Sequence, residues 1–310
     1  MKLLIALIKS ARPRQWLKNL SLFAAIVFEG SLLNPVKFAL VFQAVVIFCI
    51  LASSVYLTND VIDMERDQLH PFKRKRPVAS GQISRSTALV FAVSGLMLAL
   101  VWSYALSVYF TLAILGYAFL QVAYSLFLKK IILLDVMAIA TGFLLRVYAG
   151  ALIINAHVTV WFLLAVVSLS LFLAVGKRRS ERTLLLGGQI QNVRSTLLKY
   201  PPALLDSLTV MFATASWLSY TMFTFLQPPV AASNFLLIDF LPKTLANTSK
   251  LLMITVPFVI YGVMRYLYII YEKKEGESPE RVLLSDSPLL ITVTLWGLSL
   301  LLIIYGIGYF

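Results

Sequence analysis

Nine long apolar stretches run along this 310-residue chain, and they limit its fold more than any other feature. A helix needs about 20 mainly apolar residues to cross a hydrocarbon core about 30 Å thick. A strand of an outer-membrane barrel would instead alternate apolar and polar residues over about ten positions, and these stretches do not alternate. The sequence therefore predicts an all-α, multi-pass transmembrane helical bundle of about nine spans. The predicted spans are residues 17–34, 37–62, 86–105, 107–127, 132–154, 157–176, 203–228, 250–271 and 288–309.

The composition agrees with a membrane protein and excludes several other classes. Only 13% of the residues are charged and 60% are hydrophobic, whereas a soluble domain has about 25% charged residues. Cys49 is the single cysteine, and His70 and His157 are too few and too far apart in sequence to suggest a metal cluster. We expect one domain over residues 1–310, in which residues 1–16 form a basic segment at the membrane interface rather than a cleaved signal peptide.

The basic residues indicate how the bundle is oriented. Lys and Arg accumulate in the cytoplasmic loops of membrane proteins. With nine spans and a cytoplasmic N-terminus, 22 of the 27 basic residues lie on the cytoplasmic side and three lie on the opposite side. Twelve of the 14 acidic residues also lie on the cytoplasmic side. We therefore expect a cytoplasmic N-terminus in a plasma (inner) membrane protein, with the polar chemistry on the cytoplasmic face.

An acidic cluster closes the second predicted span. Asn59, Asp63 and Asp67 recur every four residues and Asp60 precedes Asp63 by three, so on a helix all four project from one face. Like charges at this spacing repel unless a cation neutralises them, and Mg²⁺ is typically held by one or two carboxylates together with substrate phosphates. This acidic stripe, residues 59, 60, 63 and 67, therefore predicts a Mg²⁺ site. The alternative is a solvated helix end whose acids pair with the adjacent basic run.

That basic run follows the acidic stripe closely. Residues 73–76 are all Lys or Arg, and such a run alone is typical of a solvated loop or of contact with anionic lipid. Beside carboxylates of the metal-binding type, the same bases can hold the phosphates that the metal also touches. We therefore predict a diphosphate site at which Lys73, Arg74 and Arg76 bind phosphate oxygens.

The fifth predicted span carries both an acid and a base. Asp135 and Arg146 share a helix face, with Arg146 roughly 16 Å further along the axis. A charged residue inside a membrane usually lines a polar cavity. We predict that these two residues, with Tyr124 and Lys129 from the preceding segment, bind a substrate. An internal ion pair is the alternative.

A third polar group lies at the cytoplasmic end of the sixth predicted span. Lys177, Arg178 and Glu181 stand at positions i, i+1 and i+4, so they can face one cavity. We include them among the candidate substrate-binding residues. For the neighbouring Arg179 and Arg182, anchoring at the membrane surface is an equally good explanation.

These segments together resemble the UbiA-type intramembrane prenyltransferase superfamily, and the resemblance covers almost the whole chain. An Asn-Asp-x-x-Asp-x-x-x-Asp stripe closes the second of nine spans, with further polar loops after spans 4, 6 and 8. Five motifs look like the decaprenyl-phosphate phosphoribosyltransferase branch. They are Arg12-Pro-Arg-Gln-Trp-Leu-Lys-Asn19, Ser53-Ser-Val-Tyr-Leu-Thr-Asn-Asp60, His70-Pro-x-Lys-Arg-x-Arg-Pro77, Gly142-Phe-Leu-Leu-Arg146 and Gly176-Lys-Arg178.

The resemblance implies an enzyme that transfers 5-phosphoribose from phosphoribosyl diphosphate (PRPP) to a polyprenyl phosphate such as decaprenyl phosphate, with Mg²⁺ as cofactor. Its partners would be these two substrates and the lipid bilayer, and no nucleic acid is expected. Whether the protein forms a homo-oligomer stays open. By resemblance, the acidic stripe is catalytic and binds the metal. The resemblance further implies that Lys18, Tyr124, Lys129 and Arg146 line the PRPP cavity and that Lys177 and Arg178 hold phosphate oxygens.

The segment after the sixth span favours this branch over ordinary prenyl transfer. Prenyltransferases of the superfamily carry a second aspartate-rich motif there, whereas residues 176–182 hold four bases and one acid. Bases suit additional phosphates rather than a second metal. Two alternatives stay open. One is a UbiA-type aromatic prenyltransferase that uses a prenyl diphosphate; the other is a transporter, against which the few charges within the spans and the absence of an inverted repeat argue.

Overall fold

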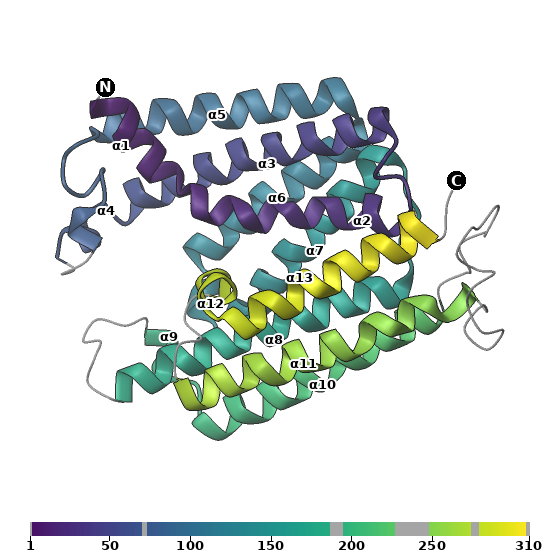
Figure 1. Cartoon of the computed structure of the whole chain (residues 1–310). Coiled ribbons are helices and arrows are strands. Elements are labelled where there is room, and N and C mark those ends of the chain that lie inside the picture. The colour runs from purple at the N-terminus through teal and green to yellow at the C-terminus, as the bar shows by residue number, and fades with distance from the viewer. Residues whose placement is uncertain (1, 70–72, 187–194, 227–247, 274–278, 308–310) are drawn as a thin grey trace. The chain divides into compact units, whose positions relative to one another are not determined.

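Figure 1 shows the computed structural model, which describes residues 2–69, 73–186, 195–226, 248–273 and 279–307. Every regular element within these ranges is helical. The α-helices are α1 Lys2–Ala11, α2 Phe23–Phe28, α3 Pro35–Ile62, α4 Met64–Gln68, α5 Arg85–Leu106, α6 Val108–Leu126, α7 Leu134–Ile154, α8 Val160–Leu186, α9 Ser195–Leu198, α10 Pro202–Leu226, α11 Val256–Tyr268, α12 Pro279–Ser285 and α13 Ser287–Leu301. The 3-10 helices are η1 Pro13–Leu22, η2 Lys73–Lys75, η3 Leu128–Lys130 and η5 Thr248–Thr255, and η6 Ile269–Lys273 and η7 Leu302–Ile307 are π-helical.

Local capping residues determine where several of the long helices begin. The Asn34 side chain accepts hydrogen bonds from the backbone N–H groups of Val36 and Lys37 at the start of α3. Ser84 caps α5 and Ser107 caps α6 in the same way. Asn and Ser are preferred at this position because their side-chain oxygens satisfy N–H groups that have no partner within the helix. The breaks between the apolar stretches are therefore encoded locally.

Seven helical segments in the described ranges are long and apolar enough to cross a membrane. They are Pro35–Ile62, Arg85–Leu106, Val108–Leu126, Leu134–Ile154, Val160–Thr183, Leu251–Lys273 and Ser287–Gly306. Each overlaps one of the nine predicted spans, so the prediction of an all-α multi-pass membrane bundle is confirmed. The predicted span 203–228 corresponds to α10, a helix of 25 residues. That α10 crosses the membrane, and with it the total of nine spans, stays a prediction.

The predicted span 17–34 changes helix type along its length, from the 3-10 helix η1 to the α-helix α2, which ends at Phe28. That this segment crosses the membrane stays a prediction. The chain runs through η1 and the short helix α2, and Gly30 with φ of 80° follows. A Cβ atom added to Gly150 of α7 would lie 2.1 Å from the carbonyl oxygen of Leu22. The backbones of η1 and α7 therefore touch directly. This contact joins η1 to α7 within the first unit.

The described residues fall into two compact units. One contains residues Met1–Ile26, Ser31–Lys129 and Leu145–Ala156, and the other contains Val27–Gly30, Lys130–Leu144 and His157–Phe310. The boundary falls within α7, which contributes a part to each unit. The single domain expected over residues 1–310 stays a prediction.

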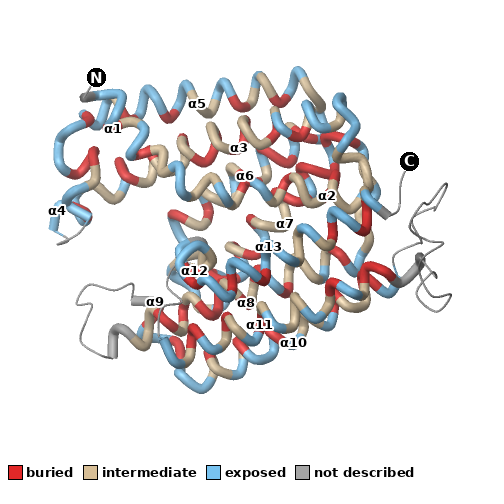
Figure 2. The backbone as a smooth tube through the Cα atoms, viewed as in Figure 1, coloured by how far each residue is buried: buried red, intermediate tan, exposed pale blue. Residues whose placement is uncertain are grey.

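In the first unit, α3 packs against α5 and α6. The core is built from fully buried apolar side chains such as Ile47, Phe48, Phe110 and Ile114. A Cβ at Gly95 of α5 would lie 2.4 Å from the Ser54 hydroxyl, so α3 and α5 are in close contact. Figure 2 shows a large exposed share on α5, and its exposed side chains are mainly apolar. A surface of this kind suits contact with lipid.

In the second unit, α8 lies along α10, and α11 lies along α13. The core joins Phe172 of α8 to Val263 and Tyr266 of α11 and to Ile269 and Ile270 of η6. The rings of Phe172 and Tyr266 meet edge to face at 5.4 Å between centroids. This packing holds the end of α8 that carries Lys177, Arg178 and Glu181.

Candidate active site

The acidic stripe spans a break between two helices in the first unit. Helix α3 ends at Ile62 and α4 begins at Met64, with Asp63 between them at φ −89° and ψ 4°. The backbone still bonds from the Asp63 N–H to the Asn59 carbonyl at 2.9 Å and from the Asp67 N–H to the Asp63 carbonyl at 2.8 Å. Aspartate is a poor residue for a helix interior. The predicted spacing is retained, but the four residues do not lie on one unbroken helix.

Two arginines bind the buried carboxylates of the stripe. Asp60 is 2% exposed, and its Oδ1 accepts hydrogen bonds from Arg12 Nη2 at 2.5 Å and from Arg76 Nη1 at 3.3 Å. Arg76 Nη1 also donates to Oδ2 of the buried Asp67 at 2.6 Å. Arg76 therefore bridges two acids that lie seven residues apart in the sequence.

Asp63 has a different partner from the two buried acids. Its side chain is 30% exposed, and its Oδ1 lies 3.9 Å from Lys129 Nζ. Lys129 belongs to η3, after the fourth predicted span. The structure thus brings together a stripe residue and a base that the sequence analysis had assigned to a separate polar group.

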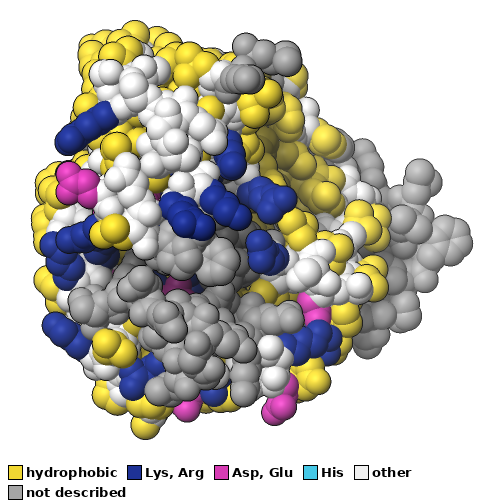
Figure 3. All heavy atoms as spheres, turned by 90° about the vertical axis from the view of Figure 1, so that its left-hand side faces the viewer, with side chains coloured by type: hydrophobic (Ala, Val, Ile, Leu, Met, Phe, Trp, Pro, Cys, Tyr) yellow, Lys and Arg dark blue, Asp and Glu magenta, His cyan; other side chains and the backbone are white. Residues whose placement is uncertain are grey.

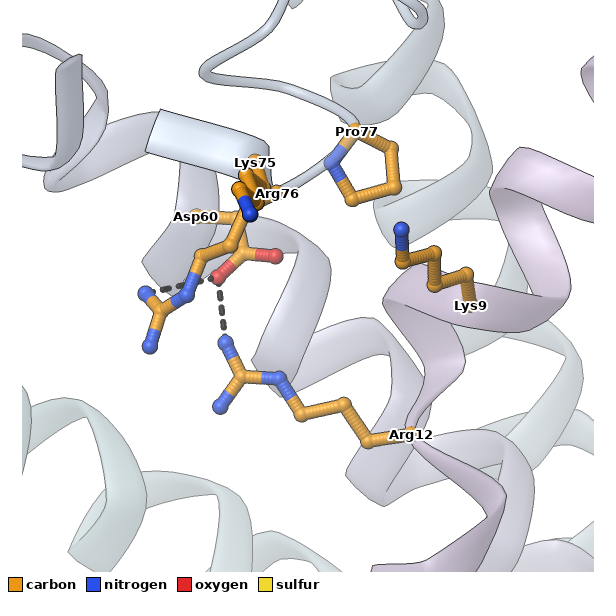
Figure 4. Close-up of a pocket in the computed structure, with 6 residues that line it drawn as sticks. All are labelled: Lys9, Arg12, Asp60, Lys75, Arg76 and Pro77. Atoms are coloured by element: carbon orange, nitrogen blue, oxygen red, sulfur yellow. Dashed lines mark hydrogen bonds and ion pairs between the residues drawn. The ribbon is translucent and has the colours of Figure 1, made fainter. Parts of the chain in front are cut away.

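A cavity of about 210 Å³ lies beside Asp60. Figure 4 shows Arg12 and Arg76 reaching the Asp60 carboxylate from opposite directions, with Lys9 of α1 on another side. The lining residues are Lys9, Arg12, Asp60, Lys75, Arg76 and Pro77. Four bases therefore surround one acid. An environment of this charge favours an oxyanion such as a phosphate group.

The acidic stripe has the donor atoms of a metal site but is not arranged as one. Its oxygen-bearing side chains are the type of ligand that Mg²⁺ prefers. As the side chains are arranged, however, guanidinium groups bind Asp60 and Asp67. Within the described part of the chain, no three His, Cys, Asp or Glu side chains are gathered to hold one metal ion. The donor chemistry fits Mg²⁺, but the arginines would have to release the carboxylates first, so the metal assignment stays a prediction.

Arg146 is buried in the part of α7 that belongs to the first unit. Its side chain donates from Nε to Asn19 Oδ1 at 2.9 Å and from Nη2 to the Tyr117 hydroxyl at 2.6 Å. The guanidinium also lies 4.7 Å from the centre of the Tyr117 ring. These contacts join η1, α6 and α7. The predicted role of Arg146 in binding PRPP stays a prediction.

The second unit contains a buried ionic cluster. Arg178 Nε donates to Asp135 Oδ2 at 2.7 Å, and Arg178 Nη1 donates to Glu181 Oε2 at 2.7 Å. Lys177 Nζ lies 3.8 Å from Glu181 Oε1. Asp135 and Arg178 are both almost fully buried, whereas Lys177 is 36% exposed. Two groups that the sequence analysis treated separately therefore meet through one ion pair.

Tyr200 completes this cluster and was missed by the sequence analysis. Tyr200 is fully buried, and its hydroxyl donates to Asp135 Oδ1 at 2.5 Å. The Tyr200 hydroxyl oxygen also accepts a hydrogen bond from the Leu133 N–H at 2.8 Å. Burial and the neighbouring Asp135 carboxylate raise the pKa of the Tyr200 hydroxyl, which keeps it protonated and able to donate. Leu133 has φ of 69°, a conformation that bulky residues rarely adopt. No local sequence pattern marks Tyr200.

The remaining candidates occupy more exposed positions. Lys73 and Arg74 are exposed on η2, and Lys18 and Tyr124 are half-buried on η1 and α6. Arg12 is a second residue that the sequence analysis missed, although it opens the first quoted motif. His70, which opens the third motif, lies outside the described residues. Figure 3 shows Lys and Arg side chains gathered on the face at which α1 and α4 lie.

Comparison with known proteins gives one consistent result. The profile of the UbiA prenyltransferase family matches residues 20–285. The decaprenyl-phosphate phosphoribosyltransferase of Mycolicibacterium smegmatis is 34% identical over 302 residues, covering 95% of this chain and 91% of that protein. The protein of the same name from Corynebacterium glutamicum is 32% identical, covering 96% and 86%.

Solved structures agree on the fold. A UbiA homolog from Archaeoglobus fulgidus, solved with DMAPP and Mg²⁺, superimposes with a TM-score of 0.64 over 96% of both chains at 20% identity. A digeranylgeranylglyceryl phosphate synthase structure gives a TM-score of 0.64 at 17% identity, covering 99% of this chain and 100% of that one. The chain is a transferase that belongs to the UbiA prenyltransferase family, in the branch of the decaprenyl-phosphate phosphoribosyltransferases.

Proposed function

We propose that this transferase moves the 5-phosphoribosyl group of PRPP to the phosphate of a polyprenyl phosphate, such as decaprenyl phosphate, and releases diphosphate. The observation that carries the proposal is the 34% identity to a decaprenyl-phosphate phosphoribosyltransferase over 95% of this chain. The charge of the candidate site supports it. Four bases surround Asp60 in the cavity of the first unit, and these suit substrates that bring several phosphate groups.

We assign the residues in line with this reaction. The acidic stripe would hold a divalent cation, for which we propose Mg²⁺, the ion present in two solved structures of a UbiA homolog from Archaeoglobus fulgidus. Such a cation, when bound, neutralises charge on the diphosphate and makes it a better leaving group. The other proposed substrate-binding residues are Lys18, Lys73, Arg74, Arg76, Tyr124, Lys129, Asp135, Arg146, Lys177, Arg178 and Glu181.

The residues of this chain act by positioning and by charge. As the bond from C1 of the ribose to the diphosphate oxygen breaks, positive charge develops on the sugar. An oxygen of the lipid phosphate forms the new bond to C1, and the electron pair of the broken bond leaves with diphosphate. A phosphate monoester is largely ionised at neutral pH, so no general base is needed. Bases such as Arg76 and Lys129 stabilise the charge that collects on the departing oxygens.

The lipid substrate accounts for the membrane fold. A polyprenyl chain is as apolar as the bilayer, so its tail can remain in lipid while its phosphate reaches the polar end of the helices. We place the enzyme in the plasma membrane with the site facing the cytoplasm, because 22 of the 27 basic residues lie on that side of the predicted topology.

The decisive experiment incubates the detergent-purified protein with Mg²⁺, radiolabelled PRPP and decaprenyl phosphate. We expect a labelled lipid that extracts into organic solvent and that does not form when decaprenyl phosphate is omitted. A parallel reaction contains geranyl diphosphate and 4-hydroxybenzoate in place of these substrates. Turnover in the second reaction and none in the first would replace the proposal with aromatic prenyl transfer.

A further inference from the structure

We propose that Arg12 and Arg76 exchange partners during substrate binding. Each guanidinium binds the stripe carboxylates in this structure and passes to phosphate oxygens when a divalent cation and a diphosphate bind together. As a consequence, the cation and the diphosphate strengthen each other's binding, and the two arginines set the size of that effect. The inference rests on the proposed function only in taking a diphosphate as the ligand.

The starting point is the balance of charge around the two buried acids. Two guanidinium groups, those of Arg12 and Arg76, lie against two carboxylates, those of Asp60 and Asp67. Both acids are almost fully buried, so an uncompensated charge on either would be strongly unfavourable. A cation that takes these carboxylates must displace two positively charged groups. Those groups in turn need a new anionic partner.

Arg12 has a strained backbone, and two side-chain contacts fix its position. Its backbone is left-handed, with φ of 53° and ψ of 63°, which is unfavourable for an arginine that precedes proline. The side chain lies 4.8 Å from the centre of the Tyr56 ring and bonds to Asp60. A strained residue of this kind persists only where surrounding contacts determine it, and such residues cluster at functional sites.

The cavity beside Asp60 is where both guanidinium groups would bind phosphate after they leave the carboxylates. Arg12 and Arg76 line it together with Lys9 and Lys75, and Asp60 is the one acid among its six lining residues. Figure 4 shows that both arginines enter from different elements and converge on the same carboxylate oxygen. A phosphate group that enters the cavity would meet two lysines and two guanidinium groups. The guanidinium N–H groups that donate to carboxylate oxygens can equally donate to phosphate oxygens, so the same donors can serve both partners.

Neither the divalent cation nor the diphosphate binds favourably without the other. A cation approaching Asp60 and Asp67 by itself competes with the arginines, and a diphosphate by itself approaches two carboxylates. When both bind, the cation takes the carboxylates and the diphosphate takes the arginines. Coupling between two ligands is reciprocal and typically amounts to roughly 5- to 150-fold in affinity.

The test measures binding of Mn²⁺, a paramagnetic probe for the divalent cation, to the detergent-purified full chain by electron paramagnetic resonance. Titrations are run with and without inorganic pyrophosphate. For the wild type we expect pyrophosphate to tighten Mn²⁺ binding by about tenfold or more. In Arg12→Gln, Mn²⁺ alone should bind more tightly than to the wild type, and the effect of pyrophosphate should shrink. Arg76→Gln should likewise raise the affinity for Mn²⁺ alone and reduce the effect of pyrophosphate.

Arg14→Gln is the matched control, because Arg14 is an exposed base two residues from Arg12 that does not line the cavity. It should bind Mn²⁺ and pyrophosphate as the wild type does. Arg12→Lys keeps the charge without the planar fork, and it should lie between the wild type and Arg12→Gln. Size-exclusion chromatography and thermal melting show whether Arg12→Gln folds. If it does not fold, Arg12→Lys replaces it in the binding titrations.

Equal or weaker Mn²⁺ binding in the arginine variants would overturn the inference, as would pyrophosphate that leaves Mn²⁺ affinity unchanged in the wild type. The result is separable from the proposed function. Pyrophosphate is part of both PRPP and prenyl diphosphates, so the coupling can be present even if phosphoribosyl transfer is not found. Conversely, labelled lipid can form from PRPP in a protein that shows no coupling.

Discussion

The carboxylate of Asp135 and the guanidinium of Arg178 form a buried ion pair, with 2.7 Å between Oδ2 and Nε and both side chains only 3% exposed. The residues are 43 positions apart, on α7 and α8. Glu181 and the Tyr200 hydroxyl complete the partners of this pair. A pair so fully enclosed contributes to stability chiefly through the penalty of breaking it.

Replacing Arg178 by Met should destabilise the protein by about 3–5 kcal/mol, because Asp135 would keep a buried charge without its guanidinium partner. The double variant Asp135→Leu with Arg178→Met should recover part of that loss. Thermal melting in detergent measures both. Lys177→Met is the control, and we expect a change below about 1 kcal/mol because its ion pair with Glu181 is partly exposed. A double variant as unstable as the sum of its single changes would contradict this prediction.

Tyr200→Phe should reduce stability by about 1–3 kcal/mol. The change removes one hydroxyl, which both donates to Asp135 and accepts from the Leu133 N–H. Both buried partners would lose that bond, and the left-handed backbone at Leu133 would lose a support. Chemical denaturation of the purified protein provides the measurement. Tyr104→Phe, at a residue that is 69% exposed, should leave stability unchanged; an equal loss there would rule out the hydrogen-bond explanation.

Asp286 should make the protein sensitive to acid. Its carboxylate caps α13 and accepts two hydrogen bonds from Arg265 and one from Lys273. The bonds from Arg265 contribute most to holding the pKa of Asp286 well below its ordinary value, and the bond from Lys273 adds to the effect. A carboxyl with a lowered pKa in the folded state stabilises the protein above its unfolded pKa of about 3.9. That stabilisation is lost as the pH falls through the folded value.

Melting curves between pH 5 and about pH 2 test this prediction. Asp286→Asn should be less stable than the wild type at pH 5, and the difference should narrow as the pH falls. Glu65→Gln changes an exposed acid on α4 and should retain the pH dependence of the wild type. A constant difference between Asp286→Asn and the wild type across this range would show that the charge of Asp286 is not responsible.

Gly150→Ala should be strongly destabilising. The added Cβ would lie 2.1 Å from the Leu22 carbonyl oxygen, and a backbone atom cannot move aside as a flexible side chain can. Gly116→Ala is the matched control within α6, since nothing lies within 4 Å of its Cβ position. Alanine favours helix over glycine, so this control should be neutral or up to about 1 kcal/mol more stable. Thermal melting separates the two, and equal behaviour would refute the close contact between η1 and α7.

Asp63→Ala should lower phosphoribosyl transfer by about 100-fold or more while the protein still folds. The Asp63 side chain is 30% exposed and lies 3.9 Å from Lys129 Nζ, so its removal should disturb the fold less than removal of the buried Asp60 would. The labelled-lipid assay gives the rate, and size-exclusion chromatography shows that the variant is folded. Glu65→Gln, two residues further on, should turn over at the wild-type rate. A near-normal rate for Asp63→Ala would mean that the acidic stripe is structural.

The sequence alone predicted the secondary structure and the membrane class well, for local physical reasons. Apolar stretches longer than 18 residues become helices in a membrane because every backbone polar group must be satisfied within the segment. The predicted span 37–62 is α3, Pro35–Ile62, and the predicted span 107–127 is α6, Val108–Leu126. Capping residues such as Ser84 and Ser107 mark the helix starts directly. The acidic stripe and the basic segments were visible for the same reason, since each lies within a few turns of chain.

Tertiary structure decided which charges meet. Asp60 bonds to Arg12, 48 residues away, and Asp135 bonds to Arg178 and to Tyr200, which no periodicity connects. The direct backbone contact between Leu22 of η1 and Gly150 of α7 likewise joins two segments that no sequence pattern connects. A sequence pattern reports how residues are spaced along one helix, whereas the pairing of buried charges depends on how separate helices pack. The sequence by itself thus determined a helical membrane protein with an acidic stripe beside basic segments, and only the fold decided which base neutralises which acid.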